Sequence, residues 1–374
     1  MKKVFIISSI FFFLMGSFYF AYYFFLKDGS ERENSFTEIG LESLNKDEKT
    51  ERKENKKISK ILEVRAADLS LDEEGGKLKY YDMTEQGFWL SSFDGSYKKK
   101  LSNDDFGNLS EVKWSKEGGE ALIKIDDAYY FYVHGKEKTL IKKSRAMDWI
   151  NFGQEILYTY EDSQTGKKTL NFSNPLGSNW KEIVEIEDDN VIMQVIPKSS
   201  KTAFWPKANG SKETEMTIVG AGGLSMETRG PAKFGSDFLW SPTGDGFIRS
   251  YTIQAGSSDL ALEKCKGDGT NCTDLKFPTI ASKCIWLKDG KNLICAQMKN
   301  LTENLVMPND YFGGKFFAED VFWKINTETG KKEKLIEEKE MEAKVDAKDL
   351  ILSPSEDFLF FINRYDNSVF RIIL

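Results

Sequence analysis

The chain has 374 residues, of which 40% are hydrophobic and 30% are charged, and its formal net charge is −7. This length and apolar content are enough for one large domain with additional segments. The acidic balance argues against nucleic acid as a partner, because neutralising phosphates requires a basic surface.

An uncharged apolar segment occupies residues 4–26, directly after Met1-Lys2-Lys3. It is long enough to cross a bilayer of about 30 Å as a helix. A cleavable signal peptide is the main alternative, but its apolar region would span only about 7–15 residues before a small-x-small cleavage site. Here the run ends in the bulky residues 22–26. The two lysines favour a cytoplasmic N-terminus at residues 1–3. The sequence therefore predicts a transmembrane signal anchor in the inner (cytoplasmic) membrane, with the rest of the chain extracytoplasmic.

Residues 27–59 are rich in Lys, Glu, Asn and Ser and contain few apolar side chains. Such a composition cannot bury enough surface to offset the entropy lost on ordering. The sequence predicts a disordered charged linker here, followed by a folded domain over residues 60–374.

A large apolar residue followed by a turn recurs along the remaining chain. The clearest copies begin at Trp114, Trp149, Trp240 and Trp286, and weaker copies begin at Leu69, Val195 and Leu352. Successive copies lie about 35 to 46 residues apart, with one interval of 66. A recurrence of this length is typical of a repeat architecture.

Each turn is followed by two runs rich in aromatic and β-branched residues, and a shorter charged run often closes the unit. Residues 121–125, 128–133 and 138–142 are one such set. Runs of this kind, bounded by Gly, Asn, Asp and Ser, are strands and hairpins. Four strands per unit at this period predict the blade of an all-β β-propeller. Counting gives seven four-stranded blades, with six and eight as alternatives.

The last unit ends at residues 368–374 without an outer strand. Residues 60–65 precede the first unit, and we predict that they fill this place, because closure removes an exposed sheet edge. Trp240 closes an inner strand before Ser-Pro-Thr-Gly, so we expect its ring to fill the wedge between two blades.

The Trp-Ser-Pro-x-Gly motif at Trp240 resembles the WD40-like repeats of TolB-type propellers. Residues 264–296 and 307–330 are similar to uncharacterised membrane-anchored propeller proteins of candidate-phylum bacteria. The resemblance covers about residues 60–374 and implies the propeller fold. It implies no particular activity, because propellers host many functions.

Four cysteines lie close together in the segment expected outside the membrane: Cys265, Cys272, Cys284 and Cys295. Their spacing matches no common zinc pattern and contains no C-x-x-C, so two disulfides are favoured. Three pairings are open. We favour Cys265–Cys272 and Cys284–Cys295, because a hairpin at Asp289-Gly290 places the second pair opposite each other.

The sequence offers little for catalysis. His134 is the single histidine and precedes a glycine at a turn, so a Ser-His-Asp triad would have to use it and a multi-histidine metal site is excluded. The acidic pairs at 104–105, 126–127 and 188–189 are typical of solvated turns, since a bound cation needs several converging oxygens. We assign no catalytic residue, no metal and no cofactor.

The longest interval contains an insertion over residues 297–320, between the second and third strands of its blade. In propellers this connection lies on the face where the blade-to-blade loops meet the channel. The insertion is aromatic, and its apolar groups must be buried, either by plugging the channel or packing on a blade, or as a lid over a partner. Long non-repeating loops often carry function. The candidate partner contacts are Asp310, Tyr311, Phe312 and Phe316.

These observations predict a membrane-tethered extracytoplasmic propeller that acts as a non-enzymatic protein- or peptide-binding or scaffolding module of the cell envelope. The expected partners are an envelope protein or peptide and, through residues 4–26, the membrane. The alternative is a propeller enzyme or binding protein acting on envelope glycans. A glycan enzyme should show two carboxylates facing a funnel lined by aromatic side chains, whereas a scaffold should show an apolar patch.

Overall fold

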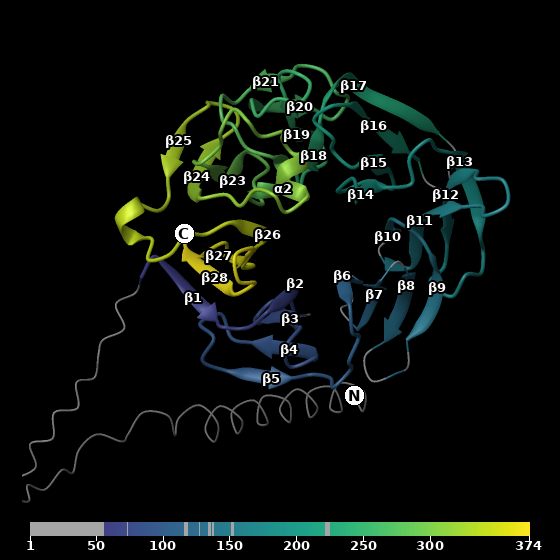
Figure 1. Cartoon of the computed structure of the whole chain (residues 1–374), viewed down its shortest axis with the longest axis horizontal. Coiled ribbons are helices and arrows are strands. Elements are labelled where there is room, and N and C mark those ends of the chain that lie inside the picture. The colour runs from purple at the N-terminus through teal and green to yellow at the C-terminus, as the bar shows by residue number, and fades with distance from the viewer. Residues whose placement is uncertain are drawn as a thin grey trace, which may run out of the picture. The chain divides into compact units, whose positions relative to one another are not determined.

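The structure is a computed structural model that describes residues 56–374, except 73, 116–118, 127, 134–135, 137, 151–152 and 221–224. These residues form seven four-stranded antiparallel sheets arranged in a ring (Figure 1). The all-β propeller with seven four-stranded blades is therefore confirmed. The predicted anchor at 4–26 lies outside the described residues, as do residues 27–55 of the linker predicted over 27–59. The end of that linker was predicted wrongly, because residues 58 and 59 belong to a β-strand. Within the described part, no helix has the length and apolar character needed to cross a membrane.

The sheets are numbered here as blades in chain order, with the innermost strand first. Blade 1 contains β2 (Ala66–Leu71), β3 (Leu78–Asp82), β4 (Gly87–Ser91) and β5 (Lys98–Lys100). Blade 2 contains β6 (Leu109–Trp114), β7 (Glu120–Ile125), β8 (Ala128–Val133) and β9 (Thr139–Lys143). Blade 3 contains β10 (Met147–Ile150), β11 (Glu155–Glu161), β12 (Lys168–Ser173) and β13 (Lys181–Glu185).

Blade 4 contains β14 (Val191–Val195), β15 (Thr202–Pro206), β16 (Glu213–Val219) and β17 (Met226–Phe234). Blade 5 contains β18 (Asp237–Trp240), β19 (Gly246–Thr252), β20 (Leu260–Lys266) and β21 (Thr273–Asp274). Blade 6 contains β22 (Cys284–Trp286), β23 (Asn292–Met298), β24 (Asp320–Asn326) and β25 (Lys332–Lys334). The short helices are η3 (Ala281–Lys283), α2 (Asn309–Phe312) and η4 (Glu338–Glu340).

Blade 7 joins the two ends of the described chain. It contains β26 (Ala347–Leu352), β27 (Phe358–Asn363), β28 (Val369–Ile373) and, as its outer strand, β1 (Ile58–Leu62). β1 pairs antiparallel with β28, with Ile58 opposite Ile372 and Leu62 opposite Val369. The predicted closure is present, but the strand starts at residue 58 rather than 60. Residues 63–65 form the connection to blade 1, because the chain must leave the rim for the innermost strand there.

The core is divided into wedges between blades. Each adjacent pair of blades encloses one cluster of buried apolar side chains. Trp240 is buried between blades 4 and 5, and Trp286 between blades 5 and 6. The indole N–H of Trp149 donates to the carbonyl of Lys113 at 2.7 Å, and that of Trp286 to the carbonyl of Leu239 at 3.2 Å. The predicted wedge position of Trp240 is therefore what the structure shows. Trp149 and Trp286 add a hydrogen bond to the preceding blade, whereas the indole N–H of Trp240 has no partner among the described residues.

The turn after Trp240 has a positional requirement for glycine. Gly244 has φ +73°, and a Cβ at this position would lie 2.1 Å from the carbonyl oxygen of Pro197 in blade 4. The turn closes through a hydrogen bond from the Gly244 N–H to the Ser241 carbonyl at 3.0 Å. A side chain here would collide with backbone of the neighbouring blade, so the conformation and the close approach both select glycine.

Both favoured disulfides are present, Cys265–Cys272 and Cys284–Cys295. The second joins the first two strands of blade 6, where Cys284 and Cys295 are register partners. The first joins β20 to the segment before β21. Each closes a short loop, and both therefore stabilise single blades rather than contacts between blades.

Candidate functional site

The insertion of blade 6 runs between β23 and β24 and contains α2. It packs on its neighbours: the Gly210 N–H of blade 4 donates to Asn309 Oδ1 at 2.7 Å, and the Met307 N–H donates to the Ser257 carbonyl of blade 5 at 3.1 Å. Its apolar residues form a cluster with Leu260 and Ile280. The insertion therefore packs on neighbouring blades, which is one of the alternatives that the sequence predicted for its apolar groups.

The four residues predicted to contact a partner differ in their exposure. Tyr311 and Phe316 are buried, with 4% and 8% of their surfaces exposed. Phe312 is partly buried, and its ring lies 5.6 Å from the Nζ of Lys207. Asp310 accepts the Val306 N–H at 2.9 Å and so shapes the turn into α2. Two other aromatic side chains beside the insertion are exposed: Phe317 and Tyr365, with ring centroids 5.4 Å apart.

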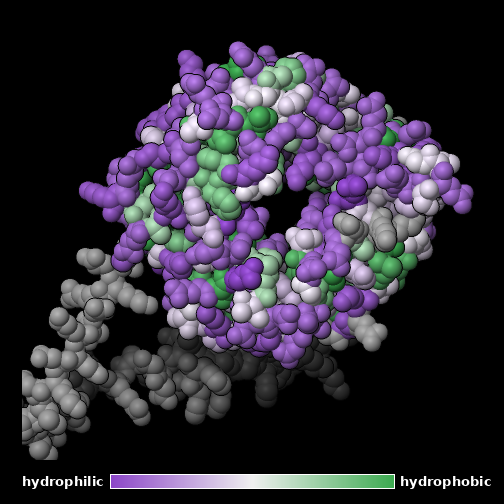
Figure 2. Space-filling view, in the orientation of Figure 1, coloured by the Kyte–Doolittle hydropathy of each residue, from purple (hydrophilic) through white to green (hydrophobic). Residues whose placement is uncertain are grey.

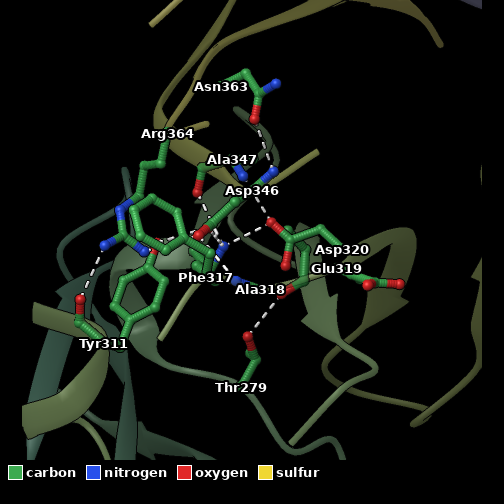
Figure 3. A network of polar contacts seen from close by, with 12 residues as sticks. Thr279, Tyr311, Phe317, Ala318, Glu319, Asp320, Asp346, Ala347, Asn363 and Arg364 are labelled. Atoms are coloured by element: carbon green, nitrogen blue, oxygen red, sulfur yellow. Dashed lines mark hydrogen bonds and ion pairs between the residues drawn. The ribbon is translucent and has the colours of Figure 1, made fainter. Parts of the chain in front are cut away.

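A buried network of charges fastens the insertion to blade 7 (Figure 3). The Nζ of Lys283 donates to Asp320 Oδ2 at 2.6 Å and to Asp346 Oδ1 at 2.8 Å. Arg364 donates to Asp346 Oδ2 at 2.7 Å and to the carbonyl of Tyr311 at 2.9 Å, while its guanidinium lies 4.0 Å from the centre of the Tyr311 ring. Two cations thus face two carboxylates, and Tyr311 is held above them.

The ionisation of this network follows from its burial. Burial alone would lower the pKa of Lys283, but the charges of Asp320 and Asp346 outweigh that effect and raise it above its ordinary value. Burial also raises the pKa of Tyr311 to about 12. Lys283 is therefore a fixed cation and Tyr311 a neutral phenol at neutral pH. Burial also raises the pKa of the Asp320 carboxyl above its ordinary value. The network stabilises the insertion.

The other sequence candidates that the structure describes do not come together in a site. His134 lies outside the described residues, as does Asp127. Asp189 is buried and pairs with Arg145 at 3.1 Å and Lys168 at 3.2 Å. The described residues contain one grouping with metal-ligand spacing, Glu263 with Cys265 and Cys272, but its two sulfur atoms are joined in a disulfide.

The central channel is surrounded mainly by hydrophilic residues (Figure 2). Three carboxyl groups on inner strands influence one another there: Asp68 on β2, Glu111 on β6 and Asp349 on β26. Withdrawal from water, followed by the negative charge of Asp349, raises the pKa of Asp68 to about 8. The Asp68 carboxyl is therefore mostly protonated at neutral pH, which reduces the negative charge of this group of three.

This shift predicts a pH dependence of stability. A carboxyl whose folded-state pKa is raised from 3.8 to about 8 stabilises the fold below its unfolded pKa, and that contribution is lost as the pH rises through 8. We expect the Asp68→Asn variant to lose less free energy of unfolding than the wild type between pH 4 and 8. Asn suits the left-handed backbone at this position, where φ is 58°. Urea unfolding across this pH range measures the difference, and parallel curves for the two proteins would contradict it.

The described residues also enclose a groove between blades 3 and 4, beside the channel, with a volume of about 480 Å³. We call it the blade 3–4 groove. It is bordered by the turns between first and second strands and between third and fourth strands, so it opens on the face opposite the insertion. Its lining is mostly apolar and consists of Trp114, Trp149, Ile150, Leu157, Phe172, Ile183, Val195 and Val219, with Lys113, Asp148, Gly153, Glu155, Ser199, Ser200, Thr202 and Gly220.

The charged end of the groove is already internally paired. The Nζ of Lys113 on blade 2 contacts Glu111 Oε1 at 3.2 Å, Asp148 Oδ2 at 3.0 Å and the carbonyl of Met147 at 2.8 Å. Burial would lower the pKa of Lys113, but Asp148 and Glu111 outweigh it and raise the pKa above its ordinary value. A lysine held protonated cannot act as a general base. The groove therefore offers an apolar binding surface with a fixed polar end.

Sequence reasoning did not find this groove. Its walls come from turns of blades 3 and 4 and from Lys113 and Trp114 at the end of β6 in blade 2, and no local pattern shows that these segments face one another. The available signal was the pair Trp114 and Trp149, two of the clearest copies of the recurring motif. Both also line the groove, and Trp114 is only partly buried.

Comparison with solved structures identifies the same architecture in enzymes. An oligogalacturonate lyase in complex with manganese matches with a TM-score of 0.59 and 10% sequence identity, over 85% of this chain and 90% of that chain. An oligogalacturonate lyase from Vibrio parahaemolyticus matches with a TM-score of 0.58 and 9% identity, over 84% of this chain and 93% of that chain. No family model matches the sequence. No curated protein matches it either. At this identity the likeness shows that the chain has the fold of these propellers.

Proposed function

We propose that this chain is a membrane-tethered, extracytoplasmic propeller that binds a protein or peptide of the cell envelope and has no catalytic activity. The observation that supports this most strongly is the blade 3–4 groove, an apolar cavity of about 480 Å³ next to the channel. Its size falls in the range of specific ligand pockets, about 300–1,000 Å³. The uncharged segment 4–26 and the charged segment 27–59 support the tether.

The groove suits an apolar side chain presented by a peptide. Trp114 and Trp149 supply aromatic walls, and the hydroxyls of Ser200 and Thr202 lie at the blade 4 side for hydrogen bonds to a peptide backbone. The lining residues that the structure describes include no histidine or cysteine, and the lysine is protonated. Such a set can bind and orient a ligand but has no activated nucleophile.

Charging the groove tests this proposal. Val195 is 39% exposed at the end of β14 and lines the groove, so Val195→Asp should leave the fold intact while placing a carboxylate in the apolar site. We expect it to weaken partner binding at least about tenfold, corresponding to about 1.4 kcal/mol. The measurement is quantitative cross-linking and capture from native membranes with the full-length chain.

The matched control is Ile253→Asp. Ile253 is 61% exposed and lies in the β19–β20 turn, on the opposite face. Recovery of the same partner in equal amount with both variants would contradict a role for the groove. Loss of the partner with Ile253→Asp alone would place the binding surface beside the insertion instead.

A second candidate is a propeller that acts on or binds envelope glycans. It is favoured by the likeness to two oligogalacturonate lyases. The carboxyl groups of Asp68, Glu111 and Asp349 beside the channel also correspond in part to the acidic funnel that such an enzyme needs. Release of fragments from envelope glycans by the purified full-length chain, abolished by Glu111→Gln, would favour this candidate over the peptide-binding module.

A further inference from the structure

A second cavity lies where the propeller closes, between blades 7 and 1. Its volume is about 430 Å³. Its walls come from the β1–β2 connection, the β3–β4 turn and the β27–β28 turn, which all lie on the insertion face. We call it the closure cleft. It is separate from the blade 3–4 groove, which opens on the opposite face.

An indole ring provides an apolar surface in the closure cleft. Trp89 of β4 is only partly buried and stands beside Tyr80, its partner across the β3–β4 ladder. The N–H of Trp89 is buried and has no hydrogen-bond partner among the described residues. An unpaired buried donor costs about 1–3 kcal/mol.

The charged side chains that line the closure cleft divide into two sets. The first is internally satisfied: Lys60 pairs with Asp366 at 3.0 Å, and Asp82 accepts the N–H groups of Thr84 at 2.8 Å and Glu85 at 3.2 Å. The second set is exposed and forms no ion pair with any described residue. It comprises two cations and two carboxylates, namely Arg65, Lys98, Glu63 and Glu85. Charges of the two signs therefore balance at the rim.

We propose that the closure cleft binds a neutral saccharide. A pyranose ring has an apolar C–H face that suits an indole surface, and its hydroxyl groups both donate and accept hydrogen bonds, as a rim of mixed charge requires. The balanced charge argues against a polyanion, which would need an excess of Lys and Arg. The cavity is within the range of small-ligand sites. This site is additional to the protein- or peptide-binding function, and it does not depend on that function.

The test is calorimetric titration of the full-length chain, held in a detergent without a sugar headgroup, with the neutral saccharides cellotetraose, maltotetraose and tetra-N-acetylchitotetraose. We expect at least one of these to bind, and we expect 0.5 M NaCl to leave its affinity unchanged within about twofold, because a neutral ligand has no charge to screen. Trp89→Ala should weaken binding at least about tenfold, and Trp89→Phe, which keeps a ring without the N–H, should weaken it less.

Two further variants make the outcome decisive. Trp180→Ala removes a tryptophan that is 52% exposed in blade 3 and should leave binding unchanged. Arg65→Ala changes an exposed cleft residue that cannot disturb the core, and it should weaken binding about threefold or more. The proposal would be overturned if none of the three saccharides bound, or if the wild type, Trp89→Ala and Arg65→Ala bound equally. It would also be overturned if tetragalacturonate alone bound and its binding were sensitive to salt. Co-sedimentation with isolated cell walls then distinguishes a polymer-bound saccharide from a free one.

Discussion

Replacing Lys283 with methionine is expected to lower the free energy of unfolding by about 3–5 kcal/mol. The Lys283 side chain is 1% exposed, and it neutralises Asp320 and Asp346, whose side chains are fully buried. One oxygen of Asp320 already has no hydrogen-bond partner among the described residues. Loss of the ammonium group would leave two buried carboxylates with only Arg364 as a counter-charge. Urea unfolding followed by tryptophan fluorescence measures the change.

The same variant should also release the insertion. The Lys283 Nζ lies 4.9 Å from the centre of the Tyr311 ring. Both side chains also donate a hydrogen bond to Asp346 Oδ1. We therefore expect faster hydrogen exchange over residues 299–319 in Lys283→Met. The control is Lys344→Met, which removes an exposed ion pair with Glu319 and should change stability by less than about 1 kcal/mol. Equal effects of the two substitutions would show that the buried network does not hold the insertion.

A charge in the closure strand is expected to have an effect of similar or greater size. Leu62 on β1 is fully buried in the cluster between blades 7 and 1. Truncating such a side chain costs about 2–5 kcal/mol, and an unpaired carboxylate in its place adds to that cost. We expect Leu62→Asp to lower the free energy of unfolding by about 5 kcal/mol or more and to expose the edge of β28. Thermal unfolding and hydrogen exchange at residues 369–373 measure both effects.

Leu176→Asp is the matched control for this prediction. Leu176 is 70% exposed in blade 3 and makes no comparable core contact, so its replacement should be nearly neutral. If Leu62→Asp unfolded at the same temperature as the control, the ring would be stable without its outer strand in blade 7. The closure would then have to be explained by the inner strands alone.

Much of the fold could be predicted because each blade repeats the same local chemistry. The turn after Trp114, Trp149, Trp240 and Trp286 marks the end of an inner strand in every case. The closure strand was also predicted, though two residues late, because residues 60–65 read as one continuous run. What ends the strand at Leu62 is the passage from rim to centre, a tertiary requirement that the run itself does not contain.

The candidate site could be predicted much less well, because its residues come from separate blades. Tyr311 was expected as a partner contact, yet it is buried over Lys283 and Arg364, which lie 28 and 53 residues away in the chain. The blade 3–4 groove likewise depends on two turns facing each other across a blade boundary. Hydrophobic periodicity reports which side chains are buried, but it does not report which buried surface leaves a cavity.

The central claim is that the blade 3–4 groove holds a peptide of an envelope protein. The most direct measurement is photo-cross-linking in native membranes from a photoreactive phenylalanine analogue placed at Ser200, which lines the groove. Mass spectrometry of the adduct should identify a peptide from an extracytoplasmic protein, and the adduct should disappear in the Val195→Asp background. A glycan adduct, or a peptide adduct that forms only from a probe placed at Ile253, would contradict the claim.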